Sequence, residues 1–264
     1  MVSYMGHVDL SARQVDSGRA TQIRDNVAAV VEEIRDTEAK AGRSCGDVRL
    51  LAATKTRTVG EIMAAIDAGI RLIGENRPQE VTAKAEGLQA LCAERGLNLK
   101  ADDGVGFHLI GQLQANKISK VLPYVGTIES VDNLQLAERI SRRAVAHGLD
   151  VGMLLEVNES GESAKSGCEP EAAMELACTM ASLPGLKLLG LMTIGAHVDD
   201  EGVIRKGFEH LRTLRDGILQ SGESGTENCR ELSMGMTHDM KYAIREGSTI
   251  VRVGTAIFGP RAFI

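Results

Sequence analysis

Apolar residues recur along the chain in two alternating patterns, short continuous runs and longer segments with apolar positions three or four residues apart. The short runs predict buried strands, at residues 48–54, 71–74, 107–111, 126–130, 151–157, 186–194, 231–234 and 248–253. The spaced segments predict helices, at residues 20–41, 58–68, 78–95, 116–122, 133–147, 170–183, 203–220 and 238–245, with a short last helix near Ala256. Strands that alternate with helices in this way indicate a parallel sheet.

Glycines stand between a helix and the next strand at four joints of this repeat, Gly69, Gly148, Gly185 and Gly247. Glycine readily adopts the left-handed conformation in which many helices end. Eight such units without a break in composition favour a closed barrel over an open sheet. We therefore predict an α/β fold, a single (β/α)8 TIM-type barrel with an extra N-terminal helix and no second β domain. Residues 19–264 are expected to form the barrel, and the polar residues 1–18 a flexible N-terminal extension.

The composition argues against several classes of protein. A net charge of −6 argues against nucleic-acid binding, which depends on Lys and Arg side chains that neutralise phosphates. Five scattered cysteines without a CxxC pair indicate free thiols, and the histidines lack the HxH or HExxH spacing of a zinc site. No apolar run is long enough to cross a membrane, and the first residues lack the apolar segment of a secretory signal. We expect a cytoplasmic protein without a nucleic-acid, membrane or metal partner.

Lys55 is the first candidate for chemistry, because it directly follows a strongly apolar strand in LLAATKT. Barrel enzymes carry their sites on the loops that follow the strands. A lysine shielded from water loses proton affinity and becomes an amine nucleophile toward aldehydes. From position alone, a solvated surface lysine is the alternative interpretation.

The ends of the seventh and eighth strands predict a phosphate site. Ser233 ends the seventh strand in SMGMT, and Gly254 and Thr255 follow the eighth in RVGTA, each before a helix. Hydroxyl groups and the N–H groups of helix N-termini suit phosphate, and barrels often bind phosphate at these two loops. Arg252 lies two residues before Gly254 and so faces the same side of its strand. Inside the barrel, its guanidinium would need an acceptor, either a pyridine nitrogen or a partner carboxylate.

Six sequence blocks together resemble one protein family. They are LLAATKTRT, LIGENRPQE, FHLIGQLQANK, SAKSGC, LLGLMTIGAH and ELSMGMTHDMKYAIREGSTIVRVGTAIFG. In this order, from about Arg19 to Arg261, they are similar to the YggS/PROSC family of pyridoxal phosphate homeostasis proteins. That family in turn resembles the N-terminal barrel domain of bacterial alanine racemases (fold type III). The chain departs from the family at Gln112, where Pro is more usual, and at Ala115, where Ser is more usual.

The resemblance implies a cofactor, pyridoxal 5′-phosphate, and the residues that bind it. Lys55 takes the place of the lysine that holds this cofactor as a Schiff base. The other cofactor-binding residues that the resemblance implies are Asn76 at the mouth of the site, Ser233, Gly254 and Thr255 at the phosphate, and Arg252 facing the pyridine nitrogen. An arginine is always cationic, so it keeps that nitrogen unprotonated and makes the ring a weaker electron sink.

The function that the resemblance implies is binding, with no robust catalytic activity. Such a protein holds the cofactor, passes it on to apo-enzymes, and takes part in intracellular vitamin B6 and amino-acid homeostasis. A lone barrel without a swapped domain is expected to be a monomer.

Two other functions stay open as alternatives. A pyridoxal phosphate-dependent amino-acid racemase needs a second acid or base opposite the lysine. The chain's tyrosines do not suit this role, because Tyr4 lies in the extension, Tyr124 precedes a strand and Tyr242 lies within a predicted helix. A cofactor-free Schiff-base lyase of the aldolase kind could use Lys55, but it would leave Arg252 and the phosphate residues unexplained.

Overall fold

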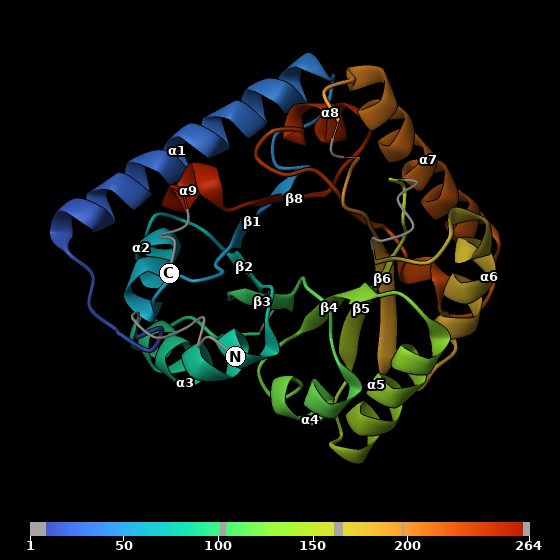
Figure 1. The fold of residues 1–264 in the computed structure, drawn as a ribbon, viewed down its shortest axis with the longest axis horizontal. Coiled ribbons are helices and arrows are strands. Elements are labelled where there is room, and N and C mark those ends of the chain that lie inside the picture. The colour runs from blue at the N-terminus through green and yellow to red at the C-terminus, as the bar shows by residue number, and fades with distance from the viewer. Residues whose placement is uncertain (1–8, 101–103, 161–165, 197, 261–264) are drawn as a thin grey trace.

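The computed structural model describes residues 9–100, 104–160, 166–196 and 198–260. In this part of the chain, eight parallel strands close into a barrel in chain order, with β8 beside β1 (Figure 1). The strands are β1 (Arg49–Ala53), β2 (Leu72–Glu75), β3 (Gly106–Leu109), β4 (Thr127–Val131), β5 (Val151–Glu156), β6 (Leu186–Met192), β7 (Glu231–Ser233) and β8 (Ile250–Val253). The predicted (β/α)8 barrel is confirmed.

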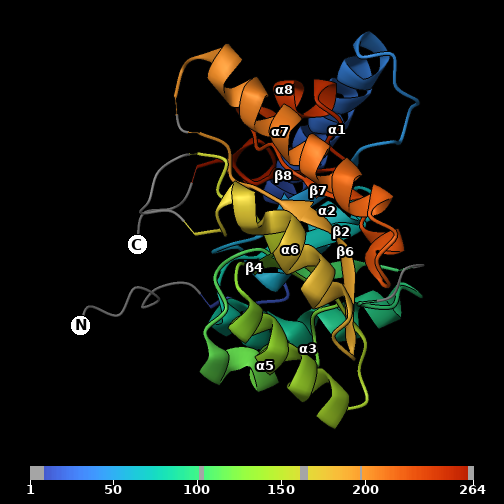
Figure 2. The same ribbon diagram turned by 90° about the vertical axis from the view of Figure 1, so that its right-hand side faces the viewer.

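Helices surround this barrel on the outside, as Figures 1 and 2 show. They are α1 (Ser17–Lys40), α2 (Val59–Asp67), α3 (Pro78–Glu94), α4 (Ile118–Val121), α5 (Leu134–Ala146), α6 (Pro170–Ala181), α7 (Glu201–Gln220), α8 (Met240–Arg245) and α9 (Thr255–Phe258). The helix predicted at residues 116–122 is divided into a 3-10 turn, Ala115–Lys117, and α4. A second 3-10 turn, Thr226–Asn228, was not predicted. In the described residues, no helix is both long and apolar enough to cross a membrane.

Successive side chains of a strand point to opposite faces of the sheet, so the apolar side chains of the barrel form two sets. A small cluster occupies the inside of the barrel and consists of Leu51, Ala53, Leu72, Ile110 and Ile250. A much larger cluster, which includes Ile73, Phe107 and Phe208, fills the layer between the strands and the helices. The four glycines predicted at helix–strand joints all have positive φ, between 63° and 106°.

The extra N-terminal helix is α1, which lies along the outside of the barrel beside α9 and α8 (Figure 1). Asp16 begins it, because its carboxylate accepts from the N–H groups of Gly18 (2.9 Å) and Arg19 (3.1 Å). Residues 9–16 of the predicted flexible extension are packed: Leu10 is buried, and its carbonyl accepts from the Val59 N–H at 3.0 Å. The extension predicted at residues 1–8 lies outside the described residues.

Candidate functional site

A column of polar side chains crosses the inside of the barrel and ends at Arg252. Arg252 Nη1 donates to the Ser233 hydroxyl and to the Ser233 carbonyl, both at 2.6 Å, and Nη2 donates to the Thr193 carbonyl at 2.7 Å. The Ser233 hydroxyl in turn donates to Glu129 Oε2 at 2.6 Å, and Glu129 Oε1 lies 2.6 Å from Nδ1 of His108. Strands β3, β4, β7 and β8 each contribute one member, so the column depends on the closed barrel.

The charges of this column stabilise one another. All its side chains are buried, and burial alone would raise the pKa of Glu129. The hydrogen bond and charge of His108, with the charge of Arg252 and the Ser233 hydroxyl, outweigh burial and hold the pKa of Glu129 below its ordinary value. Glu129 is therefore an anion whose two oxygens both accept, which requires the proton of a neutral His108 to sit on Nδ1.

Arg252 is held in one orientation by only part of its hydrogen-bond donors. A guanidinium has five N–H groups, and three of them are used by Ser233 and Thr193. Burial lowers the pKa of Arg252, while Glu129 opposes that effect. The partner carboxylate that the sequence left as an alternative is present, but it is reached through Ser233. Among the described residues, the other two N–H groups of Arg252 have no acceptor.

A second buried network fixes the backbone on both sides of Lys55. The Lys84 ammonium, from α3, donates to the Thr54 carbonyl at 3.0 Å, to Glu75 Oε1 at 2.6 Å and to Glu80 Oε2 at 2.9 Å. Glu80 Oε2 also accepts from the Thr56 N–H at 2.7 Å. Lys55 is half-buried and lies between these two tethered residues.

The backbone is unusual immediately after Lys55. Thr56 has a φ of 62°, which is a rare value for a β-branched residue and costs about 1–3 kcal/mol. Its N–H bond to Glu80 keeps the residue in this conformation. Such strain persists only where the surrounding structure enforces it, so this turn is a further sign that the position of Lys55 matters.

The carboxyl groups in this network are not equivalent. Burial, only partly offset by Lys84, raises the pKa of Glu75 to about 7. Burial also raises the pKa of Glu80, but the charge of Lys84 and the hydrogen bond from the Thr56 N–H outweigh burial. The pKa of Glu80 is therefore lower than its ordinary value. Glu75 Oε2 is buried, and no described residue forms a hydrogen bond with it. Glu75 is therefore the group of this network that gains a proton near neutral pH.

The loops after β1 and β8 lie against each other. In the barrel, Leu51 pairs with Arg252 and Ala52 with Val253. Gly254 comes so close to β1 that an added Cβ would lie 3.2 Å from the Ala53 carbonyl oxygen. Thr255 then begins α9, and the first N–H groups of a helix have no acceptor within the helix. The predicted amine and the predicted phosphate residues therefore share one end of the barrel.

Arg57 holds these two loops together. Its guanidinium donates to the carbonyls of Gly259 and Pro260, each at 3.0 Å, and lies 5.7 Å from the centroid of the Phe258 ring. Arg57 stands two residues after Lys55, and Phe258 ends α9. The contact thus fixes the start of α9 relative to the lysine loop.

Asn76 follows β2 at the same end of the barrel. Its side-chain oxygen Oδ1 is buried and has no hydrogen-bond partner in the part of the chain that the structure describes. A Cβ on Gly111, after β3, would lie only 2.3 Å from the Asn76 carbonyl oxygen, so only glycine fits there. A buried acceptor without a donor is costly, and it indicates a place where a ligand or water supplies the missing N–H or O–H.

The structure brings Lys55, Asn76, Arg252, Gly254 and Thr255 to one end of the barrel, as the sequence predicted. Ser233 lies deeper and is fully buried, and its hydroxyl is already bonded to Glu129 and Arg252. The contact predicted between Ser233 and phosphate stays a prediction.

Sequence reasoning missed most of both networks. It did not select most of the residues that support Arg252 and Lys55, namely His108, Glu129, Glu75, Glu80 and Lys84. An acid inside the apolar strand segment TIESV was the available signal for Glu129. Cys168, left open as a reactive thiol, is buried, and burial raises its pKa to about 12, which makes it a poor nucleophile.

Comparison with known proteins identifies the family. Residues 25–262 match the family model described as alanine racemase, N-terminal domain. A pyridoxal phosphate homeostasis protein of Aquifex aeolicus (strain VF5) is 37% identical over 239 residues, which cover 90% of this chain and 98% of that protein. This chain belongs to the family of pyridoxal phosphate homeostasis proteins. The resemblance inferred from the six sequence blocks is therefore confirmed.

Solved structures extend the family match to three dimensions. A crystal structure of an unknown protein from Bifidobacterium adolescentis is 66% identical, with a TM-score of 0.93, and the match covers 95% of this chain and 100% of that chain. PipY of Synechococcus elongatus PCC7942, in its structure with PLP bound, is 31% identical, with a TM-score of 0.69. That match covers 86% of this chain and 100% of PipY. Members of the family thus share the barrel described above.

Proposed function

We propose that this protein binds pyridoxal 5′-phosphate at the C-terminal end of the barrel and holds it as a Schiff base on Lys55. Its role would be in intracellular vitamin B6 and amino-acid homeostasis; the relatives it matches are named pyridoxal phosphate homeostasis proteins. The observation that carries the proposal is the fixed guanidinium of Arg252, whose strand pairs directly with the strand that leads to Lys55. PipY, a relative of the same fold, was solved with PLP bound.

The residues at this end of the barrel fit the chemical groups of that cofactor. When bound, pyridoxal phosphate supplies an aldehyde that condenses with a primary amine, and Lys55 supplies the amine. Arg252 has two N–H groups left for the ring nitrogen. The backbone at Gly254 and Thr255, at the start of α9, suits the phosphate. Asn76 has a buried oxygen that lacks a donor.

The chain's other residues act by positioning. Ser233, Thr193 and Glu129 fix the plane of the Arg252 guanidinium. Lys84 and Glu80 fix the peptide groups on either side of Lys55. A permanent cation at the ring nitrogen disfavours the proton that strong carbanion chemistry requires. The arrangement therefore favours holding and passing on the cofactor, with apo-enzymes as the receiving partners, over rapid turnover.

Chemical trapping tests the attachment at Lys55. Protein incubated with pyridoxal phosphate should show the visible absorbance of a Schiff base. Borohydride reduction followed by peptide mass spectrometry should then place the label on Lys55. Lys55→Ala should lose both signals, whereas Lys206→Ala, an exposed lysine on α7, should keep them. An unchanged band and an equal label elsewhere in Lys55→Ala would contradict the proposal.

A second measurement separates the binding protein from the racemase. The loaded protein is incubated with L-alanine in deuterated water, and exchange at Cα is followed by NMR. A binding protein should exchange the Cα proton no faster than free pyridoxal phosphate at the same concentration. Rapid exchange together with loss of optical activity would favour the racemase.

A further inference from the structure

A cavity of about 860 Å³ opens at the opposite, N-terminal end of the barrel. The starts of several strands line it, and the proposed Lys55 site lies at the other end. Its size falls within the range of small-molecule sites. This end of a TIM barrel ordinarily serves stability, so a cavity of this size needs its own explanation.

The walls of this cavity are apolar and its charged rim is cationic. Leu72, Leu154 and Ile250 line its interior. Cationic side chains outnumber carboxylates among the described lining residues, with Arg35, Arg49, Arg71, Lys100 and Lys187 against Glu38, Asp150 and Glu231. Among the described lining residues the balance of charge is therefore positive, although the chain as a whole has a net charge of −6. A local field of this sign favours an anion.

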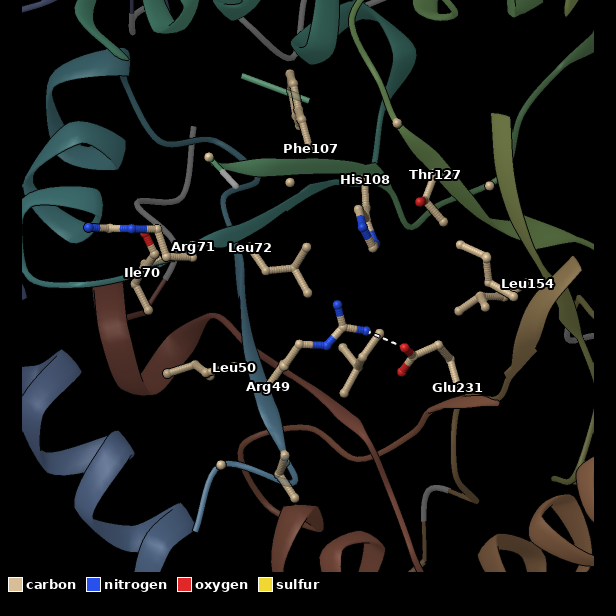
Figure 3. Close-up of a pocket in the computed structure, with 18 of the residues that line it drawn as sticks. Arg49, Leu50, Ile70, Arg71, Leu72, Phe107, His108, Thr127, Leu154 and Glu231 are labelled. Carbon is tan, nitrogen blue, oxygen red and sulfur yellow. Dashed lines mark hydrogen bonds and ion pairs between the residues drawn. The ribbon is translucent and has the colours of Figure 1, made fainter. Parts of the chain in front are cut away.

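Three polar side chains converge on the middle of the cavity. Figure 3 shows Arg49, Glu231 and His108 directed toward one another, with Leu72 and Leu154 on either side. Arg49 Nη2 lies 2.7 Å from Glu231 Oε1, and in the described part of the chain Arg49 makes no other ion pair. The side chain of Arg49 is 52% exposed, so a ligand that enters the cavity can reach it.

His108 presents its second ring nitrogen to this space. Nδ1 is bonded to Glu129, so Nε2 is the nitrogen on the cavity side. Nε2 lies next to Gly106, another lining residue, because a Cβ built there would be 3.7 Å from it. Within the described residues, no side chain or backbone group is bonded to Nε2. With the ring proton on Nδ1, Nε2 is an acceptor, so it can take a hydrogen bond from water or from a ligand O–H or N–H, while of Arg49, Glu231 and His108 only Arg49 can bind a carboxylate.

We propose that this cavity is a second binding site, which takes a small organic carboxylate with a short apolar body. Arg49 binds the carboxylate, and the apolar body lies against Leu72 and Leu154. Glu231 competes with the ligand for Arg49. The inference does not depend on the proposed cofactor site, since Arg49, Glu231, Leu72 and Leu154 do not belong to it.

Binding of 4-methylpentanoate, measured by calorimetry on the full-length protein, tests the site. Its neutral amide has the same apolar body and should bind at least about tenfold more weakly, because it lacks the charge that Arg49 recognises. NMR of labelled Leu and Ile methyl groups locates the ligand, and the signals of Leu72, Leu154 and Ile250 should shift. No binding, equal binding of the amide, or shifts that leave these methyl groups unchanged would overturn the proposal.

Two variants with opposite expected effects guard against simple misfolding. Arg49→Gln should weaken 4-methylpentanoate binding by about tenfold or more. Glu231→Gln removes the competing carboxylate and should tighten binding by about threefold or more. Arg24→Gln, an exposed pair with Asp25 on α1, is the matched control and should change nothing. Glu231→Gln that weakens binding, or Arg49→Gln that leaves it unchanged, would refute the assignment.

Inorganic phosphate separates the carboxylate class from oxyanions in general. Phosphate carries charge but has no apolar body. It should therefore bind in this cavity more weakly than 4-methylpentanoate, as measured by the shifts of the Leu72, Leu154 and Ile250 methyl signals. Phosphate that binds there as tightly would overturn the role given to Leu72 and Leu154.

Discussion

Substituting Glu75 with glutamine tests whether this carboxyl group is protonated in the folded protein near neutral pH. Its pKa is about 7 in the fold, against an ordinary 4.5, because the group is buried. A glutamine amide has the shape of the protonated carboxyl. Its oxygen can accept from Thr54 and Lys84 as Oε1 now does, and its N–H₂ group takes the place of Oε2, which has no partner among the described residues.

The sign and size of the pH effect follow from this raised pKa. Between pH 4.5 and about 7, the folded protein keeps a proton that the unfolded chain has released. The stability from this proton is complete below pH 4.5 and is lost as the pH rises through 7. The gap corresponds to about 3 kcal/mol in the free energy of unfolding, of which about 2 kcal/mol is lost between pH 5.5 and 8.

Glu75→Gln cannot titrate, so it should lack this loss. Urea unfolding followed by circular dichroism, from pH 5.5 to 8, gives the free energy of unfolding of both proteins. The difference between Glu75→Gln and wild type should move in favour of the variant by about 2 kcal/mol across this range. Glu86→Gln, on the exposed side of α3, should differ from wild type by a constant small amount. Parallel curves for Glu75→Gln and wild type would refute the assigned protonation.

Two other substitutions probe a buried lysine within α3 and the exposed cap of α7. Lys84→Met leaves two buried carboxyl groups without their cation, and it should lower the free energy of unfolding at pH 8 by about 3–5 kcal/mol, with a smaller loss at pH 5.5; an equal loss at both pH values would contradict the role of Glu75. Asp200→Ala removes the carboxylate that accepts from Gly202 and Val203 at the start of α7, and should cost about 1 kcal/mol. Calorimetry should show a fall in Tm of about 2–4 °C for this variant, and an unchanged Tm would mean that the cap contributes nothing.

The barrel could be predicted from the sequence because its signals are local. Each strand is a short apolar run, and glycines such as Gly148 and Gly247 end helices in the left-handed conformation that only glycine adopts freely. Once the strands are located, the positions of their ends are known, and Lys55, Arg252 and Thr255 lie at or near those ends. The C-terminal ends of all strands of a barrel lie at the same end. It could therefore be predicted, without knowledge of side-chain packing, that these residues share one end of the barrel.

The polar networks could not be predicted in the same way, because they depend on which strand faces which. Strands of a parallel barrel are buried on both sides, so they lack the alternation of polar and apolar residues that would mark Glu129 as facing inward. Lys84 lies on a helix, where a charged residue ordinarily indicates a solvated face. It is buried because the loop after β1 folds over the start of α3. Thr56 adopts a left-handed conformation, which β-branched residues rarely do, so nothing in the sequence indicated it.

The column from His108 to Arg252 is best explained by what it does for Arg252. A barrel interior is ordinarily filled by branched apolar side chains in layers, and a buried ion pair seldom adds net stability over such packing. Among the described residues no direct ion pair joins Glu129 to Arg252, and the Ser233 hydroxyl bridges them instead, so the arrangement is not a simple ion pair. It does fix the guanidinium plane at three points and leaves two donors unused. A column built to stabilise the barrel would use those donors, whereas one built to present them to a ligand would leave them as they are.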